Sequence, residues 1–133
     1  MDTPPGTAPA AAESRPKHVL IIDDDPDVRS TSEILLKMLD FQVTTAATGL
    51  AGIERAKALR PDIALIDLGM PGLDGLEVGA RIRAELGQAI HLVALTGYSR
   101  ESDFADTKAA GFDQHLVKSG DPRELIQALR AVR

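Results

Sequence analysis

The side chains best suited to chemistry in this sequence are polar or charged and follow short apolar runs. Asp23, Asp24, Asp67, Thr96 and Lys118 all occupy such positions. Crowded carboxylates repel one another and raise each other's pKa unless a cation lies among them. Hard carboxylate oxygens suit Mg²⁺, which readily takes phosphate as a further ligand. If a fold gathers these groups, they predict a site for phosphoryl transfer with Asp67 as the nucleophile.

The segment around Asp67 is the most informative part of the chain. The continuous apolar run 63–66 before it predicts a strand that is buried on both faces. Gly and Pro residues from Gly69 onward indicate a loop, and Asp74 then has the position of a helix N-cap, with Glu77 completing a capping box. Asp67 is therefore expected at the carboxyl end of a central strand, where open α/β sheets bind their ligands.

The order of apolar runs and turn residues predicts five strands that alternate with five helices. We therefore expect an α/β fold with a doubly wound parallel sheet in the flavodoxin-like strand order 2-1-3-4-5. In such a sheet all carboxyl ends lie on one edge, which would bring the five polar groups together. The expected strands are 18–22, 41–46, 63–66, 90–95 and 114–117, and the expected helices begin near Asp25-Pro26, Leu50, Gly75, Ser99 or Ser102, and Asp121-Pro122.

Helical spacing within the first expected helix predicts which of its side chains face the sheet. The predicted inward residues are Val28, Thr31, Ile34, Leu35, Met38 and Leu39.

Composition narrows the classes of protein and of partner. The 133 residues suit one domain, for which we expect residues 17–133, preceded by a disordered Ala- and Pro-rich lead or linker over residues 1–16. A net charge of −5 and only 3% aromatic residues disfavour a nucleic-acid partner. The absence of cysteine excludes disulfides and thiolate metal sites. Without a secretory signal or a membrane-spanning run, we expect a cytoplasmic protein with no membrane partner.

The sequence resembles the receiver domain of bacterial two-component response regulators over residues 17–133. Four motifs carry the resemblance in the order and spacing of that family: Val19-Leu20-Ile21-Ile22-Asp23-Asp24-Asp25-Pro26, Asp67-Leu68-Gly69-Met70-Pro71-Gly72-Leu73-Asp74-Gly75, Ala94-Leu95-Thr96-Gly97 and Leu116-Val117-Lys118.

The resemblance implies a role for each residue that matches a motif. Asp67 matches the phosphoacceptor, which takes its phosphoryl group from a histidine kinase or a phosphotransfer protein. Asp24 matches the direct Mg²⁺ ligand, Asp23 the residue that holds metal-bound water, and Gly69 the position whose backbone carbonyl binds the metal. The implied activity is that of a signalling switch that acts on a downstream protein partner, not that of a turnover enzyme.

The resemblance also covers the residues that sense the phosphoryl group. Thr96 and Lys118 match the groups that bind its oxygens, whereas His115 stands where the family usually has an aromatic switch residue. Ser119 replaces the usual proline after the lysine. Because a cis bond before a residue other than proline costs about 2.5–4 kcal/mol, we expect the Lys118–Ser119 bond to be trans.

The sequence also leaves two other functions open. A Mg²⁺-dependent phosphatase could use Asp23 as nucleophile and Asp25 as acid, although this reading leaves the Asp67 motif unexplained. A DNA-binding regulator would need an effector domain and a different charge. Two arrangements stay open: the chain acts alone by docking to partners, or it forms the receiver of a hybrid histidine kinase.

Overall fold

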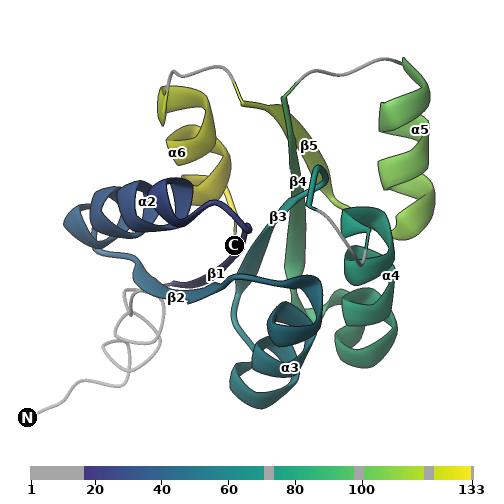
Figure 1. Ribbon diagram of the computed structural model, residues 1–133, viewed down its shortest axis with the longest axis horizontal. Coiled ribbons are helices and arrows are strands. Elements are labelled where there is room, and N and C mark those ends of the chain that lie inside the picture. Colours follow the sequence, from purple (N-terminus) through teal and green to yellow (C-terminus); the bar gives the residue numbers. More distant parts are fainter. Residues whose placement is uncertain (1–16, 71–73, 98–100, 119–121, 133) are drawn as a thin grey trace, which may run out of the picture.

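The computed structural model of the protein describes residues 17–70, 74–97, 101–118 and 122–132. Five parallel strands form one sheet in the order β2-β1-β3-β4-β5, which confirms the predicted flavodoxin-like α/β fold (Figure 1). The elements are β1 His18–Ile22, α2 Pro26–Met38, β2 Gln42–Ala46, α3 Gly49–Leu59, β3 Ile63–Asp67, α4 Gly75–Leu86, η1 Gly87–Ala89, β4 His91–Thr96, α5 Glu101–Ala110, β5 Gln114–Val117 and α6 Pro122–Arg130.

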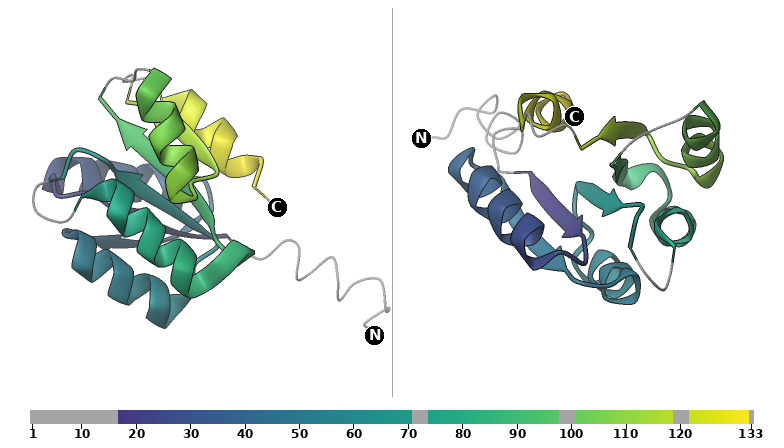
Figure 2. Two further views of the ribbon diagram at one scale, coloured as in Figure 1. Left: turned by 90° about the vertical axis from the view of Figure 1, so that its right-hand side faces the viewer. Right: turned by 45° about the horizontal axis from the view of Figure 1, so that its top comes forward.

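Helices cover both faces of the sheet (Figures 1 and 2). Successive strand residues point to opposite faces, so Val19 and Ile21 of β1 pack with Leu36 of α2 and Leu129 of α6. Their neighbours Leu20 and Ile22 face the other way. The core on that side is larger and includes side chains of β1, β3, β4, α3 and α4, among them Leu20, Ile22, Ile53, Ala56, Ile66, Val78, Ile82, Leu86, Leu92 and Phe112.

The inward face predicted for α2 is partly wrong. Leu36 is its fully buried residue, whereas Ile34 and Met38 are 61% and 76% exposed. Thr31 is exposed as well, and Val28, Leu35 and Leu39 are partly buried. Apolar residues lie on more than one side of this helix, so helical spacing alone does not fix which side meets the sheet.

The helix ends follow the local chemistry of the sequence. Asp25 caps α2 by accepting a hydrogen bond from the Asp27 N–H, with proline in the first turn, and Asp74 caps α4 by accepting from the Leu76 N–H. Glu77, which was expected to complete a capping box at α4, forms an ion pair with Arg81 one turn later. At the start of α5, Glu101 is already helical, so Ser102 is not its N-cap.

Some predictions fall on parts of the chain that the structure does not describe. They are the disordered lead over residues 1–16, the alternative N-cap Ser99, and the trans bond between Lys118 and Ser119. Within the described ranges, no helix is both long enough and apolar enough to cross a lipid bilayer.

Candidate functional site

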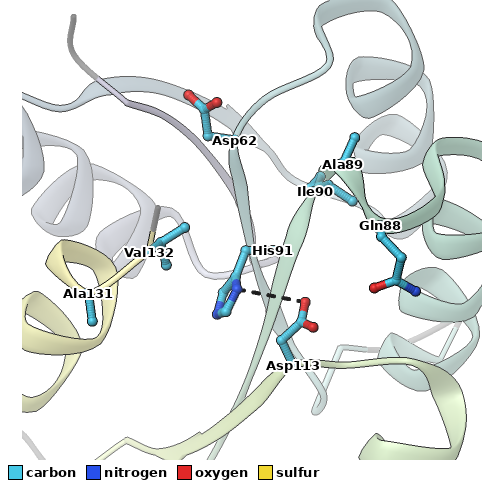
Figure 3. Close-up of a pocket in the computed structure, with 8 residues that line it drawn as sticks. All are labelled: Asp62, Gln88, Ala89, Ile90, His91, Asp113, Ala131 and Val132. Atoms are coloured by element: carbon cyan, nitrogen blue, oxygen red, sulfur yellow. Dashed lines mark ion pairs between the residues drawn. The ribbon is translucent and has the colours of Figure 1, made fainter. Parts of the chain in front are cut away.

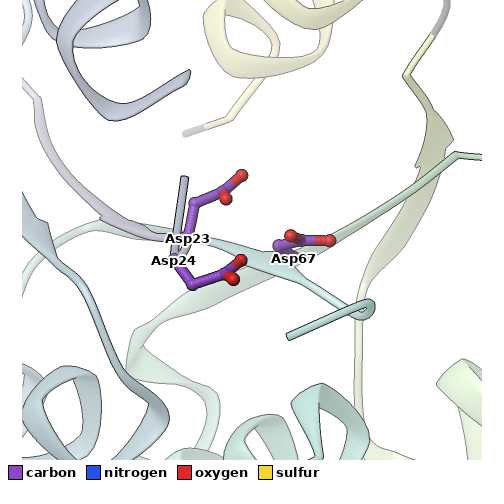
Figure 4. A group of neighbouring side chains, drawn as sticks. All are labelled: Asp23, Asp24 and Asp67. Carbon is purple, nitrogen blue, oxygen red and sulfur yellow. The ribbon is translucent and has the colours of Figure 1, made fainter. Parts of the chain in front are cut away.

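Three carboxylates meet at the carboxyl edge of the sheet. The neighbouring strands β1 and β3 pair with Ile22 opposite Ile66, so the next residues, Asp23 and Asp67, are neighbours as well. Asp24 lies beside them, and oxygen atoms of the three carboxylates lie within 4.8 Å of one another (Figure 4). The fold therefore brings together the acidic residues that the sequence predicted to converge.

Asp23 is held from its backbone and from its side chain. Its N–H donates to the Ala46 carbonyl at 3.1 Å, and its Oδ1 accepts from the Asp25 N–H at 3.0 Å. Asp23 is only 1% exposed, while Asp24 is exposed to solvent. The two adjacent carboxylates thus differ in environment, one fixed inside the protein and the other open to incoming groups.

Asp67 ends β3 and is fixed by the loop that follows it. Its Oδ1 accepts a hydrogen bond from the Gly69 N–H at 2.9 Å, and the residue is 8% exposed. Gly75 packs directly beneath this strand end, where a Cβ atom would lie only 2.7 Å from the Asp67 carbonyl oxygen. The close approach of α4 to β3 therefore requires glycine at position 75.

Lys118 places one ammonium group between two of the carboxylates. Its Nζ lies 3.2 Å from Asp23 Oδ2 and 3.3 Å from Asp67 Oδ2. The lysine follows β5 directly, and its N–H donates to the Thr96 carbonyl at the end of β4. Burial alone would lower the pKa of the Lys118 ammonium group, but the charges of Asp23 and Asp67 raise it above its usual value.

The acidic cluster is short of positive charge. Burial raises the pKa of the Asp23 carboxyl above its usual value, and the charge of Asp67 adds to this, against the opposing effects of the Asp25 N–H and Lys118. A further cation would offset the repulsion between the Asp23 and Asp67 carboxylates. A donor set made only of carboxylate oxygens is the kind that Mg²⁺ accepts, so the residues present fit that ion.

The structure places Thr96 and His115 on the two strands beyond β3. Thr96 is the last residue of β4 and directly follows Leu95, the register partner of Asp67. His115 lies on β5, where its Nδ1 is 3.1 Å from the Thr107 Oγ1 of α5. The imidazole is thus linked to the buried hydroxyl of α5 in this conformation.

Arg29 is a residue of this site that the sequence analysis missed. Its Nη1 donates to the backbone carbonyl of Asp23 at 3.0 Å. The signal available in the sequence was a basic residue four positions after the N-cap Asp25, which places it one turn into α2 on the side of the cap.

A polar pocket of about 220 Å³ lies at the opposite edge of the sheet. His91 begins β4, and Asp62 and Asp113 precede β3 and β5, so these lining residues mark the amino ends of the strands (Figure 3). His91 Nδ1 lies 3.8 Å from Asp113 Oδ2. This pocket is therefore separate from the carboxylate cluster.

Comparisons with known proteins agree on one family. Residues 19–130 match the family model described as the response regulator receiver domain. The transcriptional regulatory protein CseB of Streptomyces coelicolor is 36% identical over 115 residues, which are 86% of this chain and 48% of that protein. The DNA-binding response regulator MtrA of Mycolicibacterium smegmatis is 30% identical over 115 residues, 86% of this chain and 50% of that protein. This chain thus spans about half the length of these two relatives.

A solved structure agrees with the same assignment. The Vibrio cholerae chemotaxis protein CheY4 superposes with a TM-score of 0.83 at 27% identity, covering 89% of this chain and 99% of that one.

Proposed function

Because this chain belongs to the response regulator receiver domain family, we propose that it is a phosphoacceptor switch in which Asp67 takes a phosphoryl group from a histidine kinase or a phosphotransfer protein. One observation carries the proposal. The Lys118 ammonium group lies 3.3 Å from the carboxylate of Asp67, at a strand end that two further carboxylates flank.

The proposed step is an exchange of one bond to phosphorus. A carboxylate oxygen of Asp67 attacks the phosphorus of the donor phosphohistidine, the P–N bond breaks, and its electron pair returns to the donor imidazole. Lys118 would bind a phosphoryl oxygen, with the Thr96 hydroxyl as the second group. Phosphoryl transfer depends mainly on such positioning and charge neutralisation.

Mg²⁺ is the proposed cofactor. Asp24 and Asp67 would bind the ion directly, Asp23 would hold one of its water molecules, and the Gly69 carbonyl would complete the protein's share of ligands. When bound, Mg²⁺ neutralises the carboxylates and the charge of the phosphoryl oxygens.

The output of the switch is proposed to be a change in a docking surface for a downstream protein. The Lys118 N–H donates a hydrogen bond to the Thr96 carbonyl, and the His115 side chain is hydrogen-bonded to that of Thr107 in α5. Contacts therefore run from the site into β4, β5 and α5. A phosphoryl group on Asp67 would bind the side chains of Thr96 and Lys118 and so shift the surface formed by β4, β5 and α5. We propose a cytoplasmic protein that acts as a switch and not as a turnover enzyme.

The relatives bear on whether nucleic acid is a partner. MtrA is named as a DNA-binding protein and is about twice as long as the region it shares with this chain. The comparisons therefore give no support to the expectation, drawn from composition, that nucleic acid is not a partner. The proposal for this chain is limited to the receiver, whether it acts alone, beside an effector domain or within a hybrid histidine kinase.

The geometry disfavours the alternative phosphatase with Asp23 as nucleophile. Asp25, which would have to act as its acid, uses its Oδ1 to accept from the Asp27 N–H at the start of α2. Asp23 itself is 1% exposed and has one oxygen bound to the Asp25 N–H and the other beside Lys118. The capping bond of Asp25 and the deeper burial of Asp23, which is 1% exposed against 8% for Asp67, count against these two roles.

The test is labelling with a small phosphodonor such as phosphoramidate in the presence and absence of Mg²⁺. Wild type should take up label that is stable to acid and labile to hydroxylamine, and Asp67→Asn should take up none. Asp40→Asn is the matched control, because Asp40 is exposed and has a φ of 70°, which asparagine tolerates. Label on the Asp67→Asn variant would refute the proposal, and label on Asp23 would support the phosphatase.

A further inference from the structure

We propose that Arg29 is a positioning residue for the Mg²⁺ site, an inference that rests on the proposed function. Its target is the backbone carbonyl of Asp23, 3.0 Å from Nη1, and not a carboxylate. Arg29 therefore holds the peptide bond that joins Asp23 to Asp24, the two acidic residues at the start of the site.

The side chain reaches this carbonyl from a fixed base. The Arg29 N–H donates to the Asp25 carbonyl at 3.0 Å, which places Arg29 in the first full turn of α2. Arg29 is partly buried, so its guanidinium group is confined near the β1–α2 turn. The hydrogen bond thus connects a rigid helix to the peptide between the two carboxylates.

The other hydrogen bonds of this turn explain why that peptide matters. Asp23 is fixed through its N–H and its Oδ1, and Asp25 through its N–H and its capping oxygen. Asp24 lies between them with an exposed side chain, so its direction depends on the two peptide bonds around it. By fixing the first of these bonds, Arg29 sets the direction of the Asp24 carboxylate toward Asp67.

The charge of Arg29 and its proposed positioning role predict opposite effects of its removal on Mg²⁺ affinity. A guanidinium group near a cation site repels the cation, so its removal would strengthen Mg²⁺ binding if charge alone mattered. If Arg29 orients Asp24, its removal weakens binding. Loss of a partner that orients a metal ligand typically lowers metal affinity about 10–100-fold. Because Arg29 acts on the backbone and not on the ligand atom, we expect a loss of about tenfold.

The experiment is calorimetric titration of MgCl₂, at one ionic strength, into wild type, Arg29→Met, Arg29→Lys and Lys37→Met, with the urea midpoint of each protein as a check on folding. Lys37 is the matched control, because it is a cation of the same helix, 56% exposed and paired with Glu33. It lies about 12 Å farther along the helix axis. Methionine keeps an apolar stem at both positions.

The expected order of Mg²⁺ affinity is wild type and Lys37→Met together, then Arg29→Lys, then Arg29→Met about tenfold below wild type. Lysine keeps the charge and can still donate a hydrogen bond to the Asp23 carbonyl, so partial recovery of Mg²⁺ affinity in a folded variant separates positioning from a general loss of stability. Equal or tighter binding by Arg29→Met would overturn the inference, as would Arg29→Lys binding more weakly than Arg29→Met. If Arg29→Met does not fold, tighter binding by Arg29→Lys than by wild type would overturn it. Absence of Mg²⁺ binding by wild type would instead refute the proposed metal site, and the inference with it.

Discussion

Arg83 should be a main source of stability at the edge of the sheet opposite the site. Its Nε donates to the Gly111 carbonyl at 2.9 Å, and its Nη1 donates to the carbonyls of Ile90 and Gly87 at 2.8 and 2.6 Å. Its Nη2 pairs with Asp113 Oδ2, which also accepts from the Leu92 N–H. One side chain of α4 thus joins the segments that lead into β4 and β5.

The expected cost of Arg83→Met follows from which of these bonds are buried. The bonds to Gly111 and Ile90 are partly buried, and leaving a buried carbonyl unsatisfied costs about 1–3 kcal/mol. The bond to Gly87 is exposed, and the Asp113 side chain is 33% exposed, so water replaces much of what these partners lose. We therefore expect a loss of about 3 kcal/mol in the free energy of unfolding.

Arg81→Met is the matched control on the same helix. Arg81 is 51% exposed and pairs with Glu77, which is 50% exposed, so the variant should lose only about 0.5 kcal/mol or less. With a slope of about 1–3 kcal/mol per molar urea, the Arg83→Met midpoint should fall by at least about 1 M. Far-UV circular dichroism during urea titration measures both variants. If the urea midpoint of Arg83→Met falls no more than that of Arg81→Met, the reasoning from buried carbonyls is refuted.

Two more predictions concern the site. Gly75→Ala should lower the free energy of unfolding by about 1–3 kcal/mol, because the new Cβ would meet backbone atoms of Asp67 and Leu68. Gly69→Ala should be tolerated, since its Cβ would lie 3.5 Å from Asp67 Oδ1, and equal urea midpoints for the two variants would contradict this reasoning. The pKa of Asp23 is raised above 3.8, so the stability of wild type relative to Asp23→Asn should be greatest below pH 3.8 and fall as pH rises through the raised pKa. Urea unfolding of both proteins across this range checks the sign, and a difference that does not change with pH would contradict it.

Local patterns in the sequence determined most of the fold. Continuous apolar runs such as 63–66 have few ways to be buried other than as central parallel strands, and alternation with helices then limits the strand order. The same patterns placed Asp23, Asp67 and Lys118 at strand ends, and parallel strands bring those ends to one edge. The meeting of these groups was therefore predictable without any knowledge of side-chain distances.

Which face of α2 packs against the sheet was decided only by the tertiary structure. Its apolar residues Ile34, Leu35, Leu36, Met38 and Leu39 cover more than one side of the helix. Helical spacing therefore allowed more than one inward face, and packing against the sheet selected the one that buries Leu36. The free energy of that choice comes from contacts with distant strands, which a local pattern does not contain.

The roles of Arg29 and Arg83 were likewise decided by tertiary structure. Both side chains donate to backbone carbonyls. Every residue of the chain has such a carbonyl, so residue types give no signal for the pairing. The partners of Arg83 at Ile90 and Gly111 become its neighbours only when β4 and β5 take their places in the sheet. Residue types and spacing thus determined which groups could do chemistry here, and the packed fold determined which long side chains hold those groups in place.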